Sequence, residues 1–360
     1  MTATERAVHR VVQIGNASSG PGGVASVVRV VNGWADAGLE VDEWPTYWHG
    51  DRRRSLRVLA ATALRVATAR RRPDEVWHFH LTQRGSFLRE GLLLALAHRR
   101  GVCCTVAIHG SSFVAFTRAH RGLVTRVLAA ASAVFVLTDA AREELQGLGL
   151  PATKVVNPVP LDSVPPTGTR AGFVFAGEVG RRKGVDTLLR AWQSAGLTDS
   201  ELVVLGPTEP GFQLPEPLPA GVQLVGPVEP AEVLARLRGA LALVLPSRAE
   251  AMPMSMLEAM SVGAPVIGTD VGQVRELVAA GGVIVPVDDP EALAQQLRRF
   301  ATSPGLADEL GAAARAVIEE RHSSDAVKAV FLAEWVRCLD AARTAQATTG
   351  RTGTGPAPEG

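Results

Sequence analysis

The sequence predicts an α/β protein made of two doubly wound, Rossmann-like domains that face each other across a cleft. Short apolar runs alternate with segments of helical periodicity along almost the whole chain, as in parallel sheets covered by helices. The chain has 360 residues, which is long for one hydrophobic core and suits two. A proline-rich stretch, residues 157–168, interrupts the pattern and is typical of a linker.

The elements follow in order along each half. In the first half, apolar runs predict strands at 10–14, 41–44, 75–79, 102–108, 133–137 and 153–156. Helical spacing predicts helices at 23–37, 53–70, 87–99, 117–130 and 139–148. The second half predicts strands at 173–176, 202–205, 223–225, 241–245, 265–268 and 282–285, and closing helices at 290–301, 305–320 and 324–339.

These elements predict an N-terminal domain over residues 1–162 and a C-terminal domain over residues 163–322. A helix over residues 323–343 is expected to pack back toward the N-terminal domain. Residues 344–360 are rich in Thr, Gly, Pro and Ala, and are expected to be disordered.

The composition is that of an ordinary globular protein, with 46% hydrophobic and 20% charged residues. No apolar stretch reaches the ~18 residues of a membrane span, and no secretory segment opens the chain. The three cysteines have no metal-binding spacing, so no metal site is expected. We therefore expect a cytoplasmic protein.

Charge is distributed unevenly although the net charge is only +1. Through Pro165 there are 20 Lys and Arg against 13 Asp and Glu, whereas the remainder has 17 against 23. Eight arginines and no acid lie between Arg52 and Arg72. Apolar residues at helical spacing accompany them, namely Leu56, Leu59, Ala60, Ala63 and Val66. This segment predicts either a helix that contacts anionic lipid peripherally or a helix that packs on the sheet with solvated arginines. No nucleic-acid-binding motif accompanies the charge.

Glu250 and Glu258 are eight residues apart on either side of Pro253, which suits the first position of a helix. Glu250 is then in the loop before the helix and Glu258 lies within it, about 7.5 Å beyond the proline. Carboxylates suit a ligand rich in hydroxyl groups, and the helix start between them suits an anion. The alternative is a solvated helix with two ordinary glutamates.

Lys183 follows the first strand of the second half, where an open parallel sheet offers a ligand crevice. It is one of three lysines in a chain with 34 arginines, which indicates a need for a compact charge, as on a phosphate. A surface lysine near a helix start is the alternative.

Gly22 and Gly23 end a small-residue loop between the first strand and its helix, where main-chain N–H groups could approach a diphosphate. The same loop matches a dinucleotide-binding pattern, with Glu43 about 20 residues after it, although the glycines come late after the strand. His109 lies just beyond a predicted strand and could donate a hydrogen bond to a sugar hydroxyl or a phosphate. His78 and His80 are expected to be packed or to line the acceptor site.

Together these segments resemble the retaining glycosyltransferase family 4, which has the GT-B fold. The matches are Gly22-Gly23, His109-Gly110, Asn157-Pro158, Gly177 to Gly184, Glu250 to Met260, and Thr269 to Glu276. The resemblance covers the chain to about residue 339. It implies a metal-independent enzyme with no cofactor that uses a nucleotide-sugar co-substrate, a UDP- or GDP-sugar.

The resemblance implies roles for single residues. Catalytic contacts would come from Glu250 on the donor-sugar hydroxyls, Lys183 on the diphosphate and His109 on the transferred sugar. The remaining donor contacts would come from Gly22, Gly23, Arg182, Val228, Met254, Ser255 and Glu258, with Val228 beside the base and Glu258 on the ribose. One departure is Glu178, where the family has an arginine on the diphosphate. Arg181, Arg182 or Arg248 could supply that charge.

We therefore predict a retaining glycosyltransferase that acts on a saccharide, a lipid-linked saccharide or a small metabolite, with cell-surface polysaccharide or glycolipid assembly as the expected setting. A sugar-nucleotide epimerase of the same fold, a non-catalytic sugar-nucleotide-binding protein and an NAD-dependent oxidoreductase are the alternatives. The sequence leaves the donor base, the acceptor and the oligomeric state open.

Overall fold

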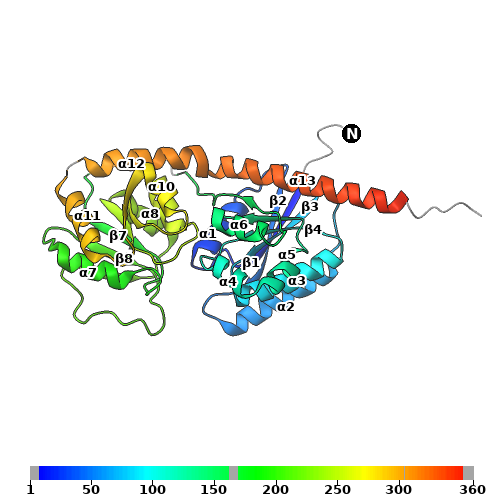
Figure 1. Ribbon diagram of the computed structural model, residues 1–360, viewed down its shortest axis with the longest axis horizontal. Coiled ribbons are helices and arrows are strands. Elements are labelled where there is room, and N and C mark those ends of the chain that lie inside the picture. The colour runs from blue at the N-terminus through cyan, green and yellow to red at the C-terminus, as the bar shows by residue number, and fades with distance from the viewer. Residues whose placement is uncertain (1–7, 162–168, 304, 352–360) are drawn as a thin grey trace, which may run out of the picture. The chain divides into compact units, whose positions relative to one another are not determined.

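The computed structural model describes residues 8–161, 169–303 and 305–351. The chain forms two compact units, each built on a six-stranded parallel sheet with helices packed against it (Figure 1). The first unit takes in the chain up to residue 109, residues 113–155 and the chain from residue 328 onward, and the second takes in 110–112 and 156–327. The two-domain α/β fold expected from the sequence is confirmed. The expected domain boundary at residue 162 lies outside the described residues.

The first sheet has the strand order β2-β1-β3-β4-β5-β6. Its strands are β1 (Arg10–Asn16), β2 (Glu40–Tyr47), β3 (Glu75–Leu81), β4 (Cys103–Ile108), β5 (Ala133–Val136) and β6 (Thr153–Lys154). Every residue of β3 and β4 is buried, as expected for central strands of a parallel sheet covered on both faces, and the buried residues of β3 include the polar Glu75, His78 and His80.

The helices of the first unit are α1 (Gly23–Asn32), α2 (Arg52–Thr68), α3 (Gly85–Arg99), α4 (Phe113–Ala119), α5 (Arg121–Leu128), α6 (Asp139–Gln146) and most of α13 (Ser324–Arg351). The single helix expected at 117–130 is wrong, because His120 has a non-helical backbone and separates α4 from α5. Helix α13 extends to Arg351, past residue 344 where disorder is expected, although residues 344–351 contain three Thr, one Gly and only two Ala. Residues 352–360 lie outside the described residues.

The second sheet has the strand order β12-β11-β10-β7-β8-β9. Its strands are β7 (Phe173–Ala176), β8 (Leu202–Leu205), β9 (Val222–Gly226), β10 (Ala242–Leu245), β11 (Val266–Thr269) and β12 (Gly282–Val285). Its helices are α7 (Val185–Ala195), α8 (Pro230–Arg238), α9 (Met254–Ser261), α10 (Val274–Gly281), α11 (Pro290–Thr302) and α12 (Leu306–Val317), followed by a π-helical turn (Ile318–His322). Trp192 on α7 packs with Phe173, Phe175 and Phe300 in the core.

Each sheet has a point at which successive strands are added on opposite sides. In the second sheet this point lies between β7 and β10, because β8 and β9 extend one edge and β11 and β12 the other. In the first sheet it lies between β1 and β3. Doubly wound sheets bind ligands beyond the carboxyl ends of the strands at these points.

Candidate functional site

Two loops lie at the switch point of the second sheet. One follows β7 and leads through Gly177 to Gly184, and the other follows β10 and leads from Pro246 to Pro253. Because β7 and β10 are parallel neighbours, both loops leave the same edge of the sheet. The segments that carry Lys183 and Glu250 in the sequence are therefore adjacent in space.

Lys183 and Glu250 form an ion pair at this point. The ammonium nitrogen Nζ of Lys183 lies 2.6 Å from Oε1 of Glu250, and the two side chains are only 11% and 8% exposed. The same oxygen accepts a hydrogen bond of 2.9 Å from the hydroxyl group of Ser247. These contacts all use Oε1, so the second oxygen keeps its capacity to accept hydrogen bonds from ligand hydroxyl groups.

Two glycines allow this close approach of the loops. Gly184 has φ of +72°, and a Cβ atom there would lie 1.9 Å from the carbonyl oxygen of Pro246. Gly272 has φ of +55°, and a Cβ atom would lie 2.2 Å from the carbonyl oxygen of Glu250. No other residue type fits either position without a shift of the main chain. Main-chain contacts on both sides therefore hold the Glu250 loop.

Helix α9 begins directly after this loop. The sequence predicts Pro253 at the first helical position, but Pro253 is the N-cap residue and the helix begins one residue later, at Met254. The N–H groups of a first helical turn have no acceptor within the helix and favour an anion. The hydroxyl oxygen of Ser255 is buried and makes no hydrogen bond within the described part of the chain. Glu258 is partly buried one turn later.

Arg182 pairs with Glu178, the acid at the position where the resemblance implies an arginine. Its guanidinium lies 3.7 Å from the carboxylate of Glu178 and 3.6 Å from that of Glu250. It also donates a hydrogen bond of 3.2 Å to the carbonyl oxygen of Ala249. Arg182 thus places a second cation beside Lys183 and pairs with Glu178.

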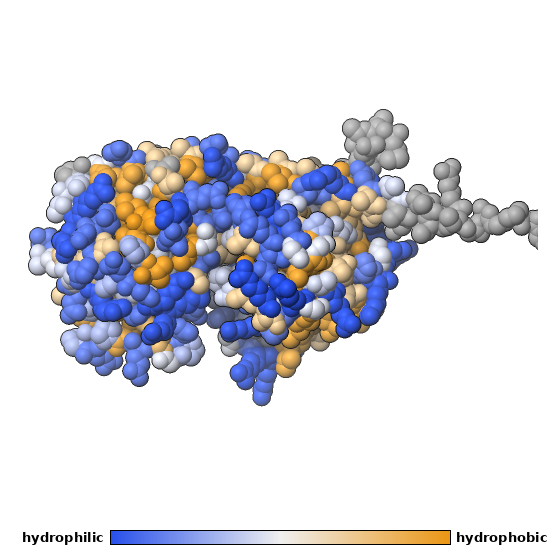
Figure 2. Space-filling view, viewed as in Figure 1, coloured by the Kyte–Doolittle hydropathy of each residue, from blue (hydrophilic) through white to orange (hydrophobic). Residues whose placement is uncertain are grey.

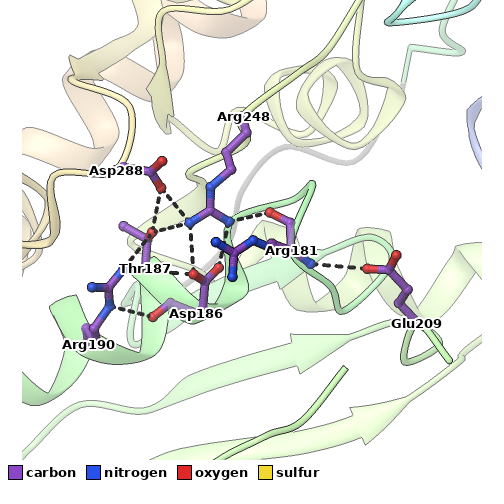
Figure 3. A network of polar contacts seen from close by, with 7 residues as sticks. All are labelled: Arg181, Asp186, Thr187, Arg190, Glu209, Arg248 and Asp288. Carbon is purple, nitrogen blue, oxygen red and sulfur yellow. Dashed lines mark hydrogen bonds and ion pairs between the residues drawn. The ribbon is translucent and has the colours of Figure 1, made fainter. Parts of the chain in front are cut away.

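Arg248 is part of a structural network instead (Figure 3). It donates two hydrogen bonds, of 2.7 and 2.8 Å, to the carboxylate of Asp186, and it is also paired with Asp288. Hydrogen bonds from Arg248 hold the pKa of Asp186 below its ordinary value. It also donates to the carbonyl oxygen of Arg181. Arg248 therefore ties the β7 loop to the start of α7, which leaves it unsuited to replace the missing arginine.

The glycine loop of the first unit leads into α1 without a side-chain cap. Gly22 is the N-cap residue with φ of +97°, and Gly23 is the first helical residue. Glu43 accepts hydrogen bonds from the backbone N–H of Ser18 (2.8 Å) and from the side-chain amide of Asn32 (2.7 Å). Because both of its oxygens are used to hold the loop, Glu43 is not placed as the ribose ligand of a dinucleotide fold.

His109 follows β4 and lies at the same edge of the first sheet as the glycine loop, which follows β1. Its Nε2 lies 3.0 Å from Nδ1 of His80, and the two rings are stacked. Burial lowers the pKa of His109 to about 4, so its imidazole is neutral at neutral pH. His78 and His80 are almost completely buried, which agrees with packed residues.

The structure thus gathers Lys183, Glu250 and Arg182 in one cluster and places Met254, Ser255 and Glu258 on the helix that follows it. Val228 lies after β9, and no hydrogen bond or ion pair joins it to this cluster among the described residues. Gly22, Gly23 and His109 belong to the first unit. The sequence analysis missed two polar residues: Ser247, which follows β10 and donates a hydrogen bond to Glu250, and Gln13, which lies inside β1 with its amide oxygen 3.0 Å from Nε2 of His80. The detectable signal was a polar residue at the end of, or inside, an apolar strand.

Within residues 8–161, 169–303 and 305–351 there is no group of three or more His, Cys, Asp or Glu side chains arranged to hold a metal ion. The helices of these segments include none with the length and apolar content that crossing a membrane requires. Cys103, Cys104 and Cys338 are buried free thiols.

The comparisons with known proteins identify the family. Residues 1–160 match the model of the glycosyl transferase 4-like domain, and residues 170–303 match that of the glycosyl transferases group 1. The chain belongs to glycosyltransferase family 4. Its two Rossmann-like domains have the GT-B fold.

Curated relatives match about two fifths of the chain. The D-inositol 3-phosphate glycosyltransferase of Streptomyces griseus is 34% identical over 161 residues, which are 40% of this chain and 34% of that protein. The D-rhamnosyltransferase WbpZ of Pseudomonas aeruginosa is 31% identical over 153 residues, 40% of this chain and 39% of that protein. The match thus spans little more than a third of these relatives' own length.

Solved structures share the fold over most of the chain. Sucrose-phosphate synthase from Thermosynechococcus elongatus has a TM-score of 0.72 at 18% identity and covers 93% of this chain and 100% of its own. Anabaena HepE, solved in complex with UDP and glucose, has a TM-score of 0.69 at 14% identity, with 89% and 97% covered.

Proposed function

We propose that this glycosyltransferase transfers a sugar from a nucleoside diphosphate sugar to a hydroxyl group, with retention of the anomeric configuration. The acceptor oxygen forms a bond to the anomeric carbon on the face from which the diphosphate departs. The bond between that carbon and the phosphate oxygen breaks, and the leaving phosphate takes the acceptor's proton. The diphosphate therefore gains negative charge during the reaction, and stabilising that charge is the main task of the site.

The Lys183–Glu250 pair beside the start of α9 carries this proposal. Lys183 and Arg182 supply positive charge, and the first turn of α9 supplies N–H donors together with the hydroxyl group of Ser255. These groups can stabilise a diphosphate without a metal ion. The free oxygen of Glu250 suits a sugar hydroxyl group, and Glu258 suits the ribose hydroxyl groups.

The similar proteins support a class of donor and a class of acceptor. HepE was solved with UDP, which supports UDP-sugars as the first donors to test, with GDP-sugars as the alternative. The relatives are named for transfer to inositol 3-phosphate and for rhamnose transfer, which supports both a small metabolite and a growing saccharide as acceptor. The three free thiols suit the reducing cytoplasm, where we place the enzyme.

A non-catalytic sugar-nucleotide-binding protein is the second candidate. Glu178, in place of the family arginine, favours it, because the acid uses part of the positive charge of Arg182. A sugar-nucleotide epimerase of the same fold would act on the donor without an acceptor. The position of Glu43 argues against the oxidoreductase.

The first test is calorimetric binding of UDP-, GDP-, ADP- and TDP-sugars and of NAD(H). Wild-type protein is compared with Glu258→Ala and with Glu309→Ala, which removes an exposed carboxylate from α12 of the same unit. We expect one nucleotide sugar to bind, and we expect Glu258→Ala but not Glu309→Ala to weaken it. Product formation with an acceptor panel then separates transfer from binding alone or from epimerisation. Binding of NAD(H) alone would overturn the proposal.

We also propose that the Arg52–Arg72 segment contacts an anionic membrane peripherally. Leu56 and Leu64 on the outer side of α2 are 68% and 64% exposed, among arginines that are also exposed. The neighbouring helix α3 adds Leu88 and Leu92, at 56% and 73%. Hydrophobic and hydrophilic residues lie side by side on the face of the molecule in Figure 2. Exposed leucines among arginines suit the boundary between lipid headgroups and acyl chains.

Vesicle flotation tests this contact. Wild-type protein should float with vesicles that contain anionic lipid and remain behind with neutral ones, and a Leu56→Ser, Leu64→Ser double variant should float less. Flotation that does not depend on anionic lipid would contradict the proposal, and so would equal flotation of the wild type and the double variant. Leu59 and Val66, which the sequence analysis groups with Leu56, face the core instead and explain how α2 packs.

A further inference from the structure

A continuous chain of side-chain hydrogen bonds leads from the glycine loop to His109 inside the first unit. Glu43 binds Asn32, and the amide oxygen of Asn32 accepts a hydrogen bond of 2.6 Å from the amide nitrogen of Gln13. The amide oxygen of Gln13 lies 3.0 Å from Nε2 of His80, and Nδ1 of His80 lies 3.0 Å from Nε2 of His109. Gln13 and His80 are almost completely buried, so these bonds are shielded from water.

The donor and acceptor of every hydrogen bond in this chain follow from groups that can only accept a hydrogen bond, namely a carbonyl oxygen and a carboxylate. The amide nitrogen of Gln13 also donates to the carbonyl oxygen of Val28 at 3.1 Å, and a carbonyl oxygen can only accept. The oxygen of Gln13 therefore faces His80, whose Nε2 must carry the hydrogen. Glu43 accepts from Asn32 in the same way, which orients the Asn32 amide consistently.

The tautomer of His109 follows from that of His80. Burial lowers the pKa of His80 well below its ordinary value, so its ring is neutral and carries one hydrogen. With that hydrogen on Nε2, Nδ1 of His80 is an acceptor, and His109 must donate to it through its own Nε2. A neutral His109 then has no hydrogen on Nδ1. Within the described segments Nδ1 makes no hydrogen bond to the protein, and it can only accept one.

We propose that Gln13 and His80, oriented by Asn32 and Glu43, are positioning residues that hold His109 with a bare Nδ1, so that His109 accepts a hydrogen bond from a hydroxyl group of a sugar substrate. In this proposal His109 accepts a hydrogen bond, whereas the sequence analysis expects it to donate one. A phosphate oxygen, which also only accepts, is excluded as its partner. The tautomer stands on the geometry of the first unit, whereas the hydroxyl partner rests on the proposed function.

Imidazole ¹⁵N NMR of the full-length protein at neutral pH, without donor, tests the tautomer directly. His109 is assigned by comparison with a His109→Gln variant. We expect the chemical shift of a hydrogen-free nitrogen at Nδ1 and of a hydrogen-bearing nitrogen at Nε2. The opposite assignment, or a rapidly exchanging mixture of the two tautomers, in the wild type would overturn the proposal.

Gln13→Met tests the chain, because methionine fills similar space and its thioether sulfur is only a weak acceptor for Nε2 of His80. Thr105→Val is its matched control: it removes the buried 2.8 Å hydrogen bond to His78, on the neighbouring strand but outside the chain. Gln13→Met should give a mixture of His109 tautomers, whereas Thr105→Val should keep the wild-type pattern. An unchanged His109 in Gln13→Met would remove Gln13 from the proposal.

Activity separates this proposal from the proposed function. Gln13→Met should lower kcat/KM for the donor by roughly tenfold relative to Thr105→Val, about the effect of one hydrogen bond. A sugar-substrate analogue in which the hydroxyl that His109 binds is replaced by hydrogen should make the two variants equal. If the tautomer is as expected but no nucleotide sugar binds, the proposed function fails while the positioning chain stands. If transfer occurs and no deoxy analogue equalises the variants, the hydroxyl partner is wrong.

Discussion

Lys183 carries more of the proposed chemistry than any other side chain. Glu250 holds its ammonium group in place through one oxygen, and a cation ordered in advance loses little further entropy when it binds a diphosphate. We expect Lys183→Ala to lower kcat/KM by ~10²-fold or more, the size of one lost contact to a developing anion. Initial rates with the preferred donor measure it. Arg190→Ala, which removes an exposed cation from α7, is the control and should leave the rate near wild type.

Near-normal turnover in Lys183→Ala would contradict its assignment to the diphosphate. Arg182 gives a graded comparison, because it is more exposed than Lys183 and also pairs with Glu178. Its loss should cost less activity than the loss of Lys183.

His78 makes the stability of the first unit depend on pH. Burial lowers the pKa of His78 to about 3, whereas in the unfolded chain it is about 6.5. Between these values the unfolded chain binds a proton that the folded chain does not, so the free energy of unfolding falls as the pH falls. From pH 7.5 to 5.0 we expect His78 to contribute a loss on the order of 2 kcal/mol.

Denaturant unfolding of wild type and His78→Phe at the two pH values measures this contribution. The variant should lose less stability at pH 5.0 than the wild type does. His98→Phe, on the exposed side of α3, should keep the wild-type dependence. Equal pH dependence in wild type and His78→Phe would contradict the prediction.

The elements around the second switch point depend on glycine. Gly184 combines a left-handed backbone with contact to the carbonyl of Pro246, and α7 begins directly after it. We expect Gly184→Ala to destabilise the second unit by roughly 3 kcal/mol, from the backbone conformation and the overlap together. Gly239→Ala at the end of α8 has φ of −93° and open space, and should change little.

Chemical denaturation of both alanine variants checks this prediction. Equal stability of the two would show that the loops can separate at little cost. Donor affinity provides a second measurement, because Gly184→Ala should also displace Lys183 from Glu250.

Local pattern predicted most elements because strands and helices depend on neighbours along the chain. All six strands of each sheet lie within a few residues of their predicted positions. The wrongly predicted elements lie where the spacing of apolar residues gives no signal. Residues 117–122, where the backbone turns at His120, are mostly polar, and the end of α13 is helical although residues 344–351 are rich in Thr.

At the scale of the whole molecule, the chain returns to its first unit at the C-terminal end. Trp335 on α13 is completely buried, and its ring lies 6.2 Å from Trp34, 5.5 Å from His78 and 5.4 Å from Phe331. Lys328 adds a hydrogen bond of 2.8 Å to the carbonyl oxygen of Trp34. The core of the first unit therefore includes residues almost 300 positions apart in the sequence.

Trp335→Ala should consequently destabilise the first unit by about 3–5 kcal/mol, as loss of a large core side chain does. Val330→Ala, on the exposed side of the same helix, is the control and should have little effect. Denaturant unfolding followed by near-UV circular dichroism measures both. Unchanged stability in Trp335→Ala would mean that α13 is dispensable for this unit.

Motif spacing alone identified the family and singled out Lys183, Glu250 and Glu258, because these signals depend on residue type and on distance along the chain. It could not decide which arginine accompanies Lys183, since Arg182 and Arg248 flank the site equally in sequence. Only the strand order, which places β7 beside β10, shows Arg182 at Glu250 and Arg248 bound to Asp186. Long-range pairing likewise decided the hydrogen-bonding role of His109, because a tautomer is set by contacts across strands that no local pattern records.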